Sequence, residues 1–237
     1  MLLVHGVAAA IRMNGEVEKI GDTPLDGAEI ESLVQPVLTP GAAAQYRDVH
    51  IADSSYRVEG LGRFRVNLHR ERGRAAATIR ALPMKVPALS ELGLPPEAAS
   101  LAALRRGLVL IGGAAGAGKS TTLAAIVNEI NQRDARHIVT IEDPVEYEHQ
   151  HLRSVIEQVE VGTDAPDFPT ALRAALRQAP DVLVIGEMRD PESMAIAGSA
   201  AETGGTTPTR RPRATRSSPG TPGTRGTRGG SHRAPVR

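Results

Sequence analysis

The spacing of apolar residues changes before the middle of the chain and divides it into two patterned regions. In the first region, polar and apolar residues alternate over 63–69 and over 75–80, on either side of a turn at Gly73. Alternation with a period of two predicts antiparallel strands with one buried face. A further strand over 11–17 meets an Asn-Gly dipeptide, which favours a tight hairpin. These segments predict a small α+β domain over residues 1–82.

Prolines punctuate the stretch that follows this domain. Pro83, Pro87, Pro95 and Pro96 all lie within residues 83–99. Because a proline disfavours helical backbone at the residue before it, we expect this stretch to be an extended linker between two domains.

Apolar runs alternate with helical patterns in the second region. The runs predict strands over 108–112, 137–141, 155–161 and 181–185, and apolar residues three and four apart predict helices over 120–131, 170–178 and 191–203. Asp190 is expected to cap the last helix and Gly204 to end it. Strands separated by helices predict a largely parallel sheet, so we expect residues 100–204 to form an α/β domain.

A glycine-rich loop joins the first of these strands to the first helix. It consists of Gly113, Ala114, Ala115, Gly116, Ala117, Gly118, Lys119 and Ser120, and it fits the pattern G-x-x-x-x-G-K-[ST]. Glycines let backbone N–H groups turn toward an anionic phosphate where a Cβ would block the approach. The pattern therefore predicts an ATP site, in which Lys119 meets the β- and γ-phosphates, Ser120 holds Mg²⁺ and Thr121 follows. A chance glycine- and alanine-rich turn is the alternative, which the strand and helix on either side disfavour.

Carboxylates follow two of the predicted strands. Glu142 and Glu146 come after the strand over 137–141, and Glu187 comes after the strand over 181–185. Because the carboxyl ends of parallel strands share one edge of a sheet, we expect these side chains near the phosphate-binding loop. A carboxylate there orients or deprotonates an attacking water, or holds Mg²⁺ through its water shell. An ordinary loop carboxylate is the alternative at each position, and the glycine-rich loop upstream favours function.

Composition narrows the class of protein. The 237 residues include no cysteine, which excludes disulfides and cysteine-ligated zinc and suits a reducing compartment. No apolar run approaches the length of a membrane span, and the N-terminus lacks the basic region and cleavage site of a signal peptide. We therefore expect a cytoplasmic protein.

The net charge of +1 hides an asymmetry between the body and the tail of the chain. Residues 204–237 hold eight arginines and no acidic residue, which leaves 20 basic against 27 acidic residues, a net charge of −7, in residues 1–203. The body therefore gives no electrostatic case for binding nucleic acid. Apart from Val236, residues 205–237 include no large apolar residue, so we expect this tail to be disordered.

The most specific motifs resemble one family. They are Thr-Ile-Glu-Asp-Pro-Val-Glu over 140–146, the segment over 168–177, Gly-Glu-Met-Arg-Asp over 186–190 and Ala-Ala-Glu-Thr-Gly over 200–204. From about residue 3 to 204 the chain resembles the secretion-type hexameric ATPases, and most of all those that retract type IV pili. The resemblance implies a PAS-like N-terminal domain and a RecA-like ATPase core, assembled as a hexameric ring. Such a ring would act on a pilus at the inner membrane, with the platform protein there as its partner.

The resemblance also implies roles for single residues. Glu146 is at the position of the catalytic glutamate that activates the attacking water, and Glu187 is at that of the Walker B glutamate, where Gly186 stands in place of the usual aspartate. Arg65 and Arg80 are similar to N-terminal arginines that reach the phosphates in some relatives. A solvated strand face is the alternative for both arginines.

The motifs over 186–190 and 200–204 favour pilus retraction over pilus assembly or type II secretion, which share the same chemistry. After Gly204, where relatives continue with a histidine and a buried strand, the chain instead reads Gly-Thr-Thr-Pro-Thr-Arg-Arg-Pro. A reading-frame slip in a GC-rich gene explains this abrupt change, and a genuine basic tail is the competing interpretation.

Three functional hypotheses follow. The first is a ring-forming ATPase motor. A slip would leave the core incomplete, with an exposed sheet edge, and this gives the second hypothesis, a truncated chain that binds nucleotide without hydrolysing it. The third is a binder of nucleic acid or acidic surfaces through residues 210–237.

Overall fold

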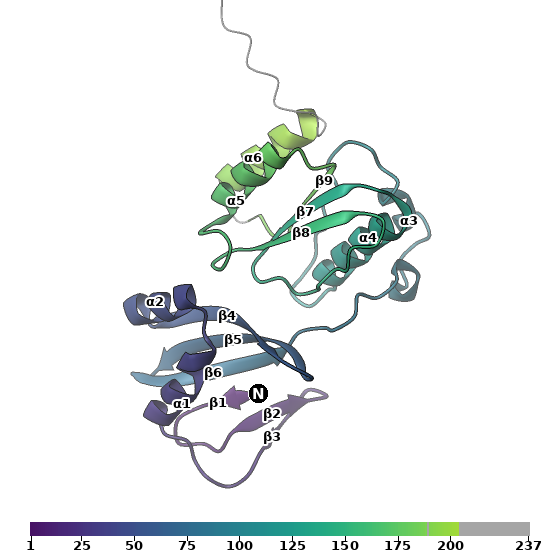
Figure 1. Cartoon of the computed structure of the whole chain (residues 1–237). Helices are drawn as coiled ribbons and strands as arrows, with labels where there is room; N and C mark the ends of the chain where they lie inside the picture. The colour runs from purple at the N-terminus through teal and green to yellow at the C-terminus, as the bar shows by residue number, and fades with distance from the viewer. Residues whose placement is uncertain (189, 204–237) are drawn as a thin grey trace, which may run out of the picture. The chain divides into compact units, whose positions relative to one another are not determined.

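The computed structural model describes residues 1–188 and 190–203 (Figure 1). The predictions made for Arg189, for Gly204 and for the tail over 205–237, including its disorder and the reading-frame slip, lie outside the described residues. The domain bounds given above also stay predictions.

The N-terminal residues fold into a six-stranded antiparallel sheet. Its order is β3-β2-β1-β6-β5-β4, from strands β1 (Leu2–Leu3), β2 (Ala10–Met13), β3 (Glu16–Lys19), β4 (Ile51–Val58), β5 (Gly62–Glu71) and β6 (Arg74–Ala81). Both predicted hairpins are present, with their turns at Asn14-Gly15 and Arg72-Gly73. All four turn residues have positive φ, the conformation that a two-residue hairpin turn needs.

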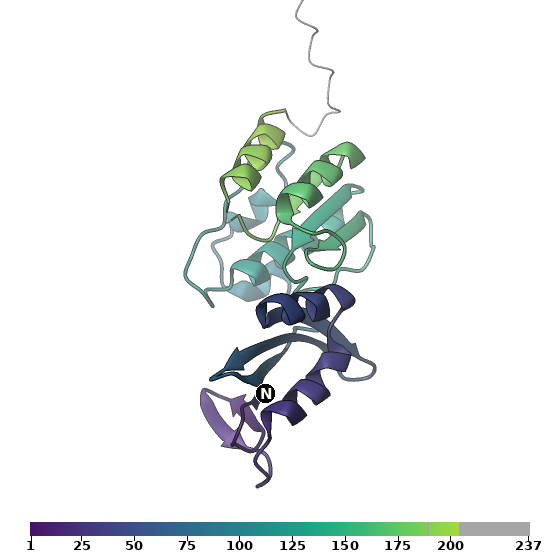
Figure 2. The ribbon, with the colours of Figure 1, turned by 90° about the vertical axis from the view of Figure 1, so that its left-hand side faces the viewer.

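Helices α1 (Gly27–Val34) and α2 (Pro40–Val49) pack against this sheet (Figure 2). A 3-10 turn, η1 (Gln35–Val37), lies between them. Both α-helices begin at a cap: Asp26 forms a capping box with Glu29, and the side chain of Thr39 accepts a hydrogen bond from the Ala42 N–H. The sequence analysis did not locate either helix, although these cap residues are recognisable signals. Together the sheet and helices enclose a core that includes Ile30, Tyr46, Val66 and Leu68.

The proline-rich stretch is not extended throughout, so that expectation is wrong in part. It includes a 3-10 turn, η2 (Leu89–Leu92), and a one-turn helix, α3 (Ala98–Leu101). Leu89 is buried in the apolar cluster of the second region. A proline restricts the residue before it but leaves the intervening residues free to turn, and burial of the leucine favours such turns.

The second region is built on a parallel sheet, as predicted, and the order of its strands is β8-β7-β9. Its strands are β7 (His137–Glu142), β8 (Val155–Glu160) and β9 (Val182–Ile185). Helix α4 (Lys119–Arg133) shares one apolar cluster with Ile138, whereas α5 (Phe168–Ala175) and α6 (Pro191–Thr203) share another with Ile141. A 3-10 turn, η3 (Leu176–Gln178), extends α5, and Asp190 caps α6 by accepting a hydrogen bond from the Ser193 N–H. The predicted α/β fold is thus formed around two layers of buried aliphatic side chains.

The strand predicted over residues 108–112 is not formed, so this prediction is wrong. Leu108 and Leu110 are 54% and 67% exposed. Strand β9 ends the sheet, and it has no strand partner on its outer side among the residues that the structure describes. An apolar run becomes a strand only where a neighbouring strand completes its backbone hydrogen bonds, and this run pairs with no strand among the described residues.

Hydrogen bonds join the antiparallel sheet to the parallel one, and the described residues all belong to one compact unit. Ser55 of β4 donates to Glu160 of β8 with an O–O distance of 2.7 Å. Arg57 of β4 pairs with Glu148 in the loop after β7. The outer face of the N-terminal sheet therefore contacts the loops at the carboxyl edge of the parallel sheet.

Candidate nucleotide-binding site

The glycine-rich loop turns sharply before helix α4 begins. Gly116 and Gly118 have φ values of +76° and +87°, a left-handed conformation that residues with a side chain rarely adopt. The Ala117 N–H donates to the Ala114 carbonyl at 3.2 Å, which closes the turn. Residues 112–117 are all exposed to solvent. The loop therefore has the conformation that its two central glycines require, and its backbone is open to a ligand.

Lys119 folds over this loop. Its Nζ donates to the carbonyl oxygens of Gly113 at 3.1 Å and Ala114 at 2.9 Å. Both acceptors are neutral, so an anionic phosphate oxygen is a stronger partner for the ammonium group. Ser120 and Thr121 follow in the first turn of α4, where free N–H groups and the helix dipole favour an anion. The open loop and the helix end thus fit the phosphates of a nucleoside triphosphate, and the contact of Ser120 with Mg²⁺ stays a prediction.

A hydrogen bond ties helix α4 to the acidic loop after β7. Thr121 Oγ1 and the Tyr147 hydroxyl lie 3.0 Å apart, and Tyr147 is 8% exposed. Tyr147 directly follows Glu146, so this contact links α4 to the loop that contains the predicted catalytic glutamate, whose role stays a prediction. Thr121 and Glu146 were predicted from the sequence, whereas Tyr147 was not.

Glu142 and Gly186 lie against each other at the ends of β7 and β9. The Gly186 N–H donates to the Ile141 carbonyl at 2.8 Å. A Cβ at Gly186 would lie 3.3 Å from that same oxygen and 3.3 Å from Glu142 Cα, closer than side chains normally pack. A side chain at Gly186 would therefore require this backbone to move by a few tenths of an ångström. Glu187 follows directly and is half-buried, and because β7 and β9 are parallel neighbours, Glu142 and Glu187 lie at the same edge of the sheet.

Glu142 is largely buried at this edge. Burial raises its pKa, while hydrogen bonds from the Thr140 hydroxyl at 2.8 Å and from Gln158 Nε2 at 3.3 Å oppose the rise. The nearby charge of Glu146 raises the pKa of Glu142 further. With Oε1 engaged by two donors, Glu142 helps to fix the shape of the site, and its contact with Mg²⁺ through water stays a prediction.

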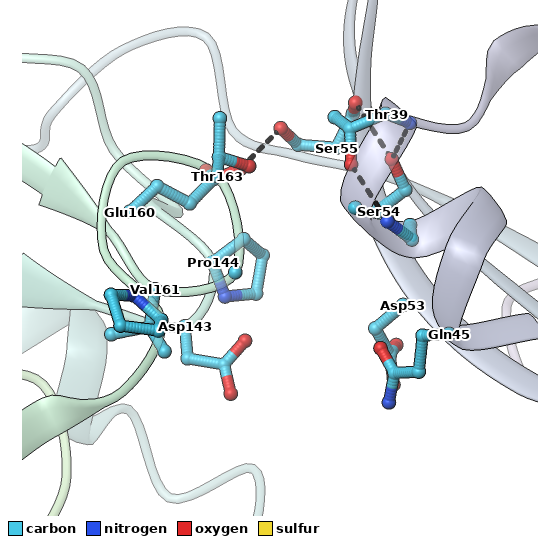
Figure 3. A pocket seen from close by; sticks show the side chains of 14 residues that line it. Thr39, Gln45, Asp53, Ser54, Ser55, Asp143, Pro144, Glu160, Val161 and Thr163 are labelled. Atoms are coloured by element: carbon cyan, nitrogen blue, oxygen red, sulfur yellow. Dashed lines mark hydrogen bonds between the residues drawn. The ribbon is translucent and has the colours of Figure 1, made fainter. Parts of the chain in front are cut away.

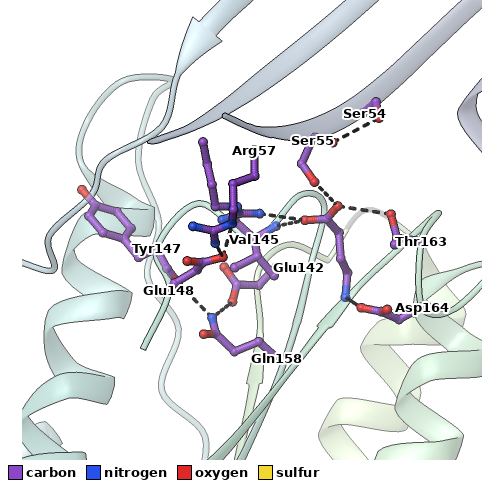
Figure 4. A network of polar contacts seen from close by, with 12 residues as sticks. Ser54, Ser55, Arg57, Glu142, Val145, Tyr147, Glu148, Gln158, Thr163 and Asp164 are labelled. Atoms are coloured by element: carbon purple, nitrogen blue, oxygen red, sulfur yellow. Dashed lines mark hydrogen bonds and ion pairs between the residues drawn. The ribbon is translucent and has the colours of Figure 1, made fainter. Parts of the chain in front are cut away.

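Side chains of β8 hold the acidic loop in place (Figure 4). Gln158 donates to the Tyr147 carbonyl at 2.9 Å and accepts from the His149 N–H at 2.8 Å. Glu160 accepts from the Val145 N–H at 3.0 Å. Sequence analysis missed both β8 residues. Glu160 is the register partner of Glu142 at the end of its strand, so the rule that pointed to Glu142 would also have found Glu160.

The half-buried imidazole of His149 makes the stability of the protein depend on pH. Burial lowers the pKa of His149 from 6.5 to about 4, because the charged ring loses hydration. The unfolded chain therefore binds more protons than the folded chain between these values, and stability falls as the pH is lowered from 6.5 to 4. We expect His149→Phe, which keeps a ring without a titrating nitrogen, to reduce this fall in the urea midpoint. An equally steep fall in the variant would contradict this assignment.

Arg65 and Arg80 lie opposite each other on β5 and β6. They are register partners, and Arg65 Nε donates to Asp53 at 3.2 Å. Across the residues that the structure describes, neither arginine has a hydrogen bond or ion pair with the glycine-rich loop. The structure thus places both on a polar strand face, and a contact with phosphates stays a prediction.

The fold and this loop together define a P-loop α/β protein with an antiparallel N-terminal sheet. The family model of the Type II/IV secretion system proteins matches residues 63–209. The chain belongs to this family.

The similar proteins include a pilus retraction ATPase and a twitching motility protein. The type IV pilus retraction ATPase PilT of Pseudomonas aeruginosa is 39% identical over 202 residues, which cover 85% of this chain and 59% of PilT. A twitching motility protein of Neisseria gonorrhoeae is 40% identical over 194 residues, covering 82% of this chain and 52% of that protein. This chain therefore spans between half and three fifths of the length of these relatives.

A crystal structure of the pilus retraction motor PilT with bound ADP has the same fold. It matches with a TM-score of 0.80 and 40% identity, over 86% of this chain and 60% of that one. The resemblance predicted from the motifs and the α/β fold are thus confirmed. The PAS-like character of the N-terminal sheet and the incompleteness of the core stay predictions.

Proposed function

We propose that this chain binds ATP and Mg²⁺ at its glycine-rich loop and hydrolyses the ATP, as one subunit of a ring that retracts type IV pili. The observation that carries the proposal is the hydrogen bond between Thr121 and Tyr147. It joins the helix that starts at Lys119 to the loop with Glu146, so the phosphate-binding and water-activating groups lie on connected elements. The ADP bound to the similar motor PilT supports a nucleotide as the ligand.

The chain's own residues divide the chemistry between them. The loop backbone and Lys119 bind the phosphates and stabilise negative charge on the γ-phosphoryl group. Mg²⁺, when bound at Ser120, supplies further neutralisation of the phosphate oxygens. Glu146 orients the attacking water and accepts its proton. Glu142 ends β7 and Glu187 follows the neighbouring strand β9, and from this edge both would hold waters of the metal.

The assembly around this site is part of the same proposal. Similarity to PilT and to the twitching motility protein supports a hexameric ring, with the pilus platform protein of the inner membrane as partner. We place the motor in the cytoplasm, at the periphery of that membrane. Within residues 1–188 and 190–203, no helix combines the length and hydropathy that crossing a bilayer requires. Pilus assembly and type II secretion are the alternative tasks for the same chemistry.

An unpaired sheet edge favours a second candidate, a chain that binds nucleotide without turnover. The run before the glycine-rich loop is exposed at Leu108 and Leu110, so the loop is not braced by a strand of its own among the described residues. A less rigid loop weakens the alignment needed for phosphoryl transfer more than it weakens binding.

The test is a titration of the purified full chain with a fluorescent ATP analogue and Mg²⁺, followed by an assay of phosphate release. We expect saturable binding, with a Kd between about 1 μM and 1 mM, and release of phosphate that requires Mg²⁺. Binding without release would support the second candidate. Absence of binding by a folded chain would contradict both.

A further inference from the structure

The loop with Glu146 is also held from the N-terminal sheet, by Arg63 of β5. Arg63 Nη1 donates to the Val145 carbonyl at 2.8 Å, and its Nη2 lies 3.3 Å from Glu160 Oε2. The side chains of Arg63 and Glu160 are only 13% and 9% exposed. The guanidinium group of Arg63 thus binds a backbone carbonyl and a carboxylate at the same time.

Glu160 accepts hydrogen bonds from both sheets. Its Oε1 accepts from Ser55 Oγ at 2.7 Å and from Thr163 Oγ1 at 3.2 Å, and its Oε2 accepts from the Val145 N–H at 3.0 Å. The carboxylate is therefore fully engaged in a site of low dielectric, where each of its bonds is strong and the loss of one is costly.

Val145 is thus bound at both of its backbone polar groups. Glu160 accepts from its N–H, and Arg63 donates to its C=O. Because Glu146 is the next residue, these two bonds fix the peptide from which the predicted catalytic side chain extends. Neither Arg63 nor Glu160 forms a hydrogen bond or ion pair with the side chain of Glu146 in the part of the chain described.

We propose that Arg63 and Glu160 form a clamp that positions Glu146 and makes hydrolysis depend on the docking of the N-terminal sheet. Withdrawal of this sheet removes Arg63 and Ser55 together, which frees the Val145 carbonyl. The Glu160 carboxylate then keeps only its hydrogen bonds from the Val145 N–H and Thr163 among the described contacts. A displacement of about 1 Å at a reacting group costs on the order of 100-fold in rate. Docking of the N-terminal sheet therefore switches the site between a productive and an unproductive geometry. The inference rests on the proposed function for the identity of the reaction, whereas the clamp rests on the contacts alone.

The space beside the clamp suits such a movement. Figure 3 shows Ser55 and Glu160 facing each other next to a cavity of about 210 Å³, which Asp53 and Asp143 also line. A contact at the wall of a cavity separates without disturbing the close-packed cores on either side. The two sheets are joined here by polar groups that water can satisfy after separation.

A neighbouring ion pair provides a matched control. Arg57 of β4 pairs with Glu148, and these side chains are 59% and 49% exposed. Arg63 Nε also lies 3.2 Å from Glu148. Arg57 thus spans the same two sheets but has no hydrogen bond to Val145 or Glu160 among the described contacts. Exposed pairs of this kind contribute little, so Arg57→Ala should leave the clamp intact.

The experiment compares Arg63→Ala, Glu160→Gln, their double variant and Arg57→Ala in the full chain. Hydrogen exchange of the amides over 143–150 reports the clamp, and kcat, KM and the Kd of the ATP analogue report the site. We expect exchange about tenfold faster or more and kcat lowered about 10- to 100-fold in each single clamp variant. The double variant should add little to either change, while Kd and the exchange of α4 should stay within about twofold of the parent.

Unchanged exchange over 143–150 in both single variants would overturn the clamp, as would an equal change in Arg57→Ala. Glu160→Gln keeps the size and one acceptor of the side chain, so it tests the clamp even where Arg63→Ala is unstable. If the parent chain shows no turnover, the proposed function fails, while the exchange measurement still confirms or overturns the clamp.

Discussion

Replacement of Lys119 by alanine is expected to abolish nucleotide binding. Among the described residues, the Lys119 ammonium has only neutral carbonyls of the glycine-rich loop as hydrogen-bond partners. No other lysine lies within that loop or the helix turn that follows. Loss of charge-assisted hydrogen bonds to two phosphates should weaken the affinity for ATP about 100-fold or more. Titration with a fluorescent ATP analogue measures this change directly.

Lys85→Ala is the matched control for this variant, because Lys85 is exposed in the proline-rich stretch away from the loop. It should bind the analogue as the parent does. If Lys119→Ala binds with the parent's affinity, the glycine-rich loop is not the nucleotide site and the proposed function fails with it.

Replacement of Glu146 by glutamine is expected to spare binding and to stop turnover. Glutamine keeps the size of the side chain and an oxygen acceptor but has little basicity. The rate of phosphate release should therefore fall by about 100- to 10,000-fold, the usual contribution of a general base, with Kd changed less than about threefold. Stopped-flow or steady-state assays measure the rate of phosphate release, and the same titration measures Kd.

Glu157→Gln serves as the control for the loss of one carboxylate. Glu157 lies on β8 and pairs with His137 at 3.0 Å on an exposed surface, so its replacement should leave the rate unchanged. Equal rates for Glu146→Gln and the parent would remove Glu146 from its catalytic role, and Glu187 would then be the next carboxylate to test.

Periodicity located most elements of the parallel region because each has a buried face and a regular neighbour. The helix expected over 120–131 extends over Lys119–Arg133, since Ile126 and Ile130 pack on β7 at helical spacing. The run over 108–112 contains as many aliphatic residues as β9, but it pairs with no strand among the described residues. Apolar composition alone therefore predicts a strand over these residues that the tertiary structure does not form.

The glycine-rich loop could be predicted because all its groups lie within eight consecutive residues. The clamp could not, because Arg63 and Val145 are 82 residues apart and meet only when the two sheets dock. Glu160 was within reach of sequence reasoning, as the acidic end of a parallel strand beside Glu142. Arg63, its partner on β5, could not be recognised from the neighbouring sequence, because an arginine on a polar strand face is usually solvated.

Gly186 limits how mutation can remodel the carboxyl edge of the sheet. Any substitution there that adds a side chain, including aspartate, would press on the backbone of Ile141 and Glu142. An acidic side chain at this position therefore requires the end of β7 to shift by a few tenths of an ångström. The negative charge that follows β9 is carried one residue later, at Glu187, where the side chain is accommodated half-buried.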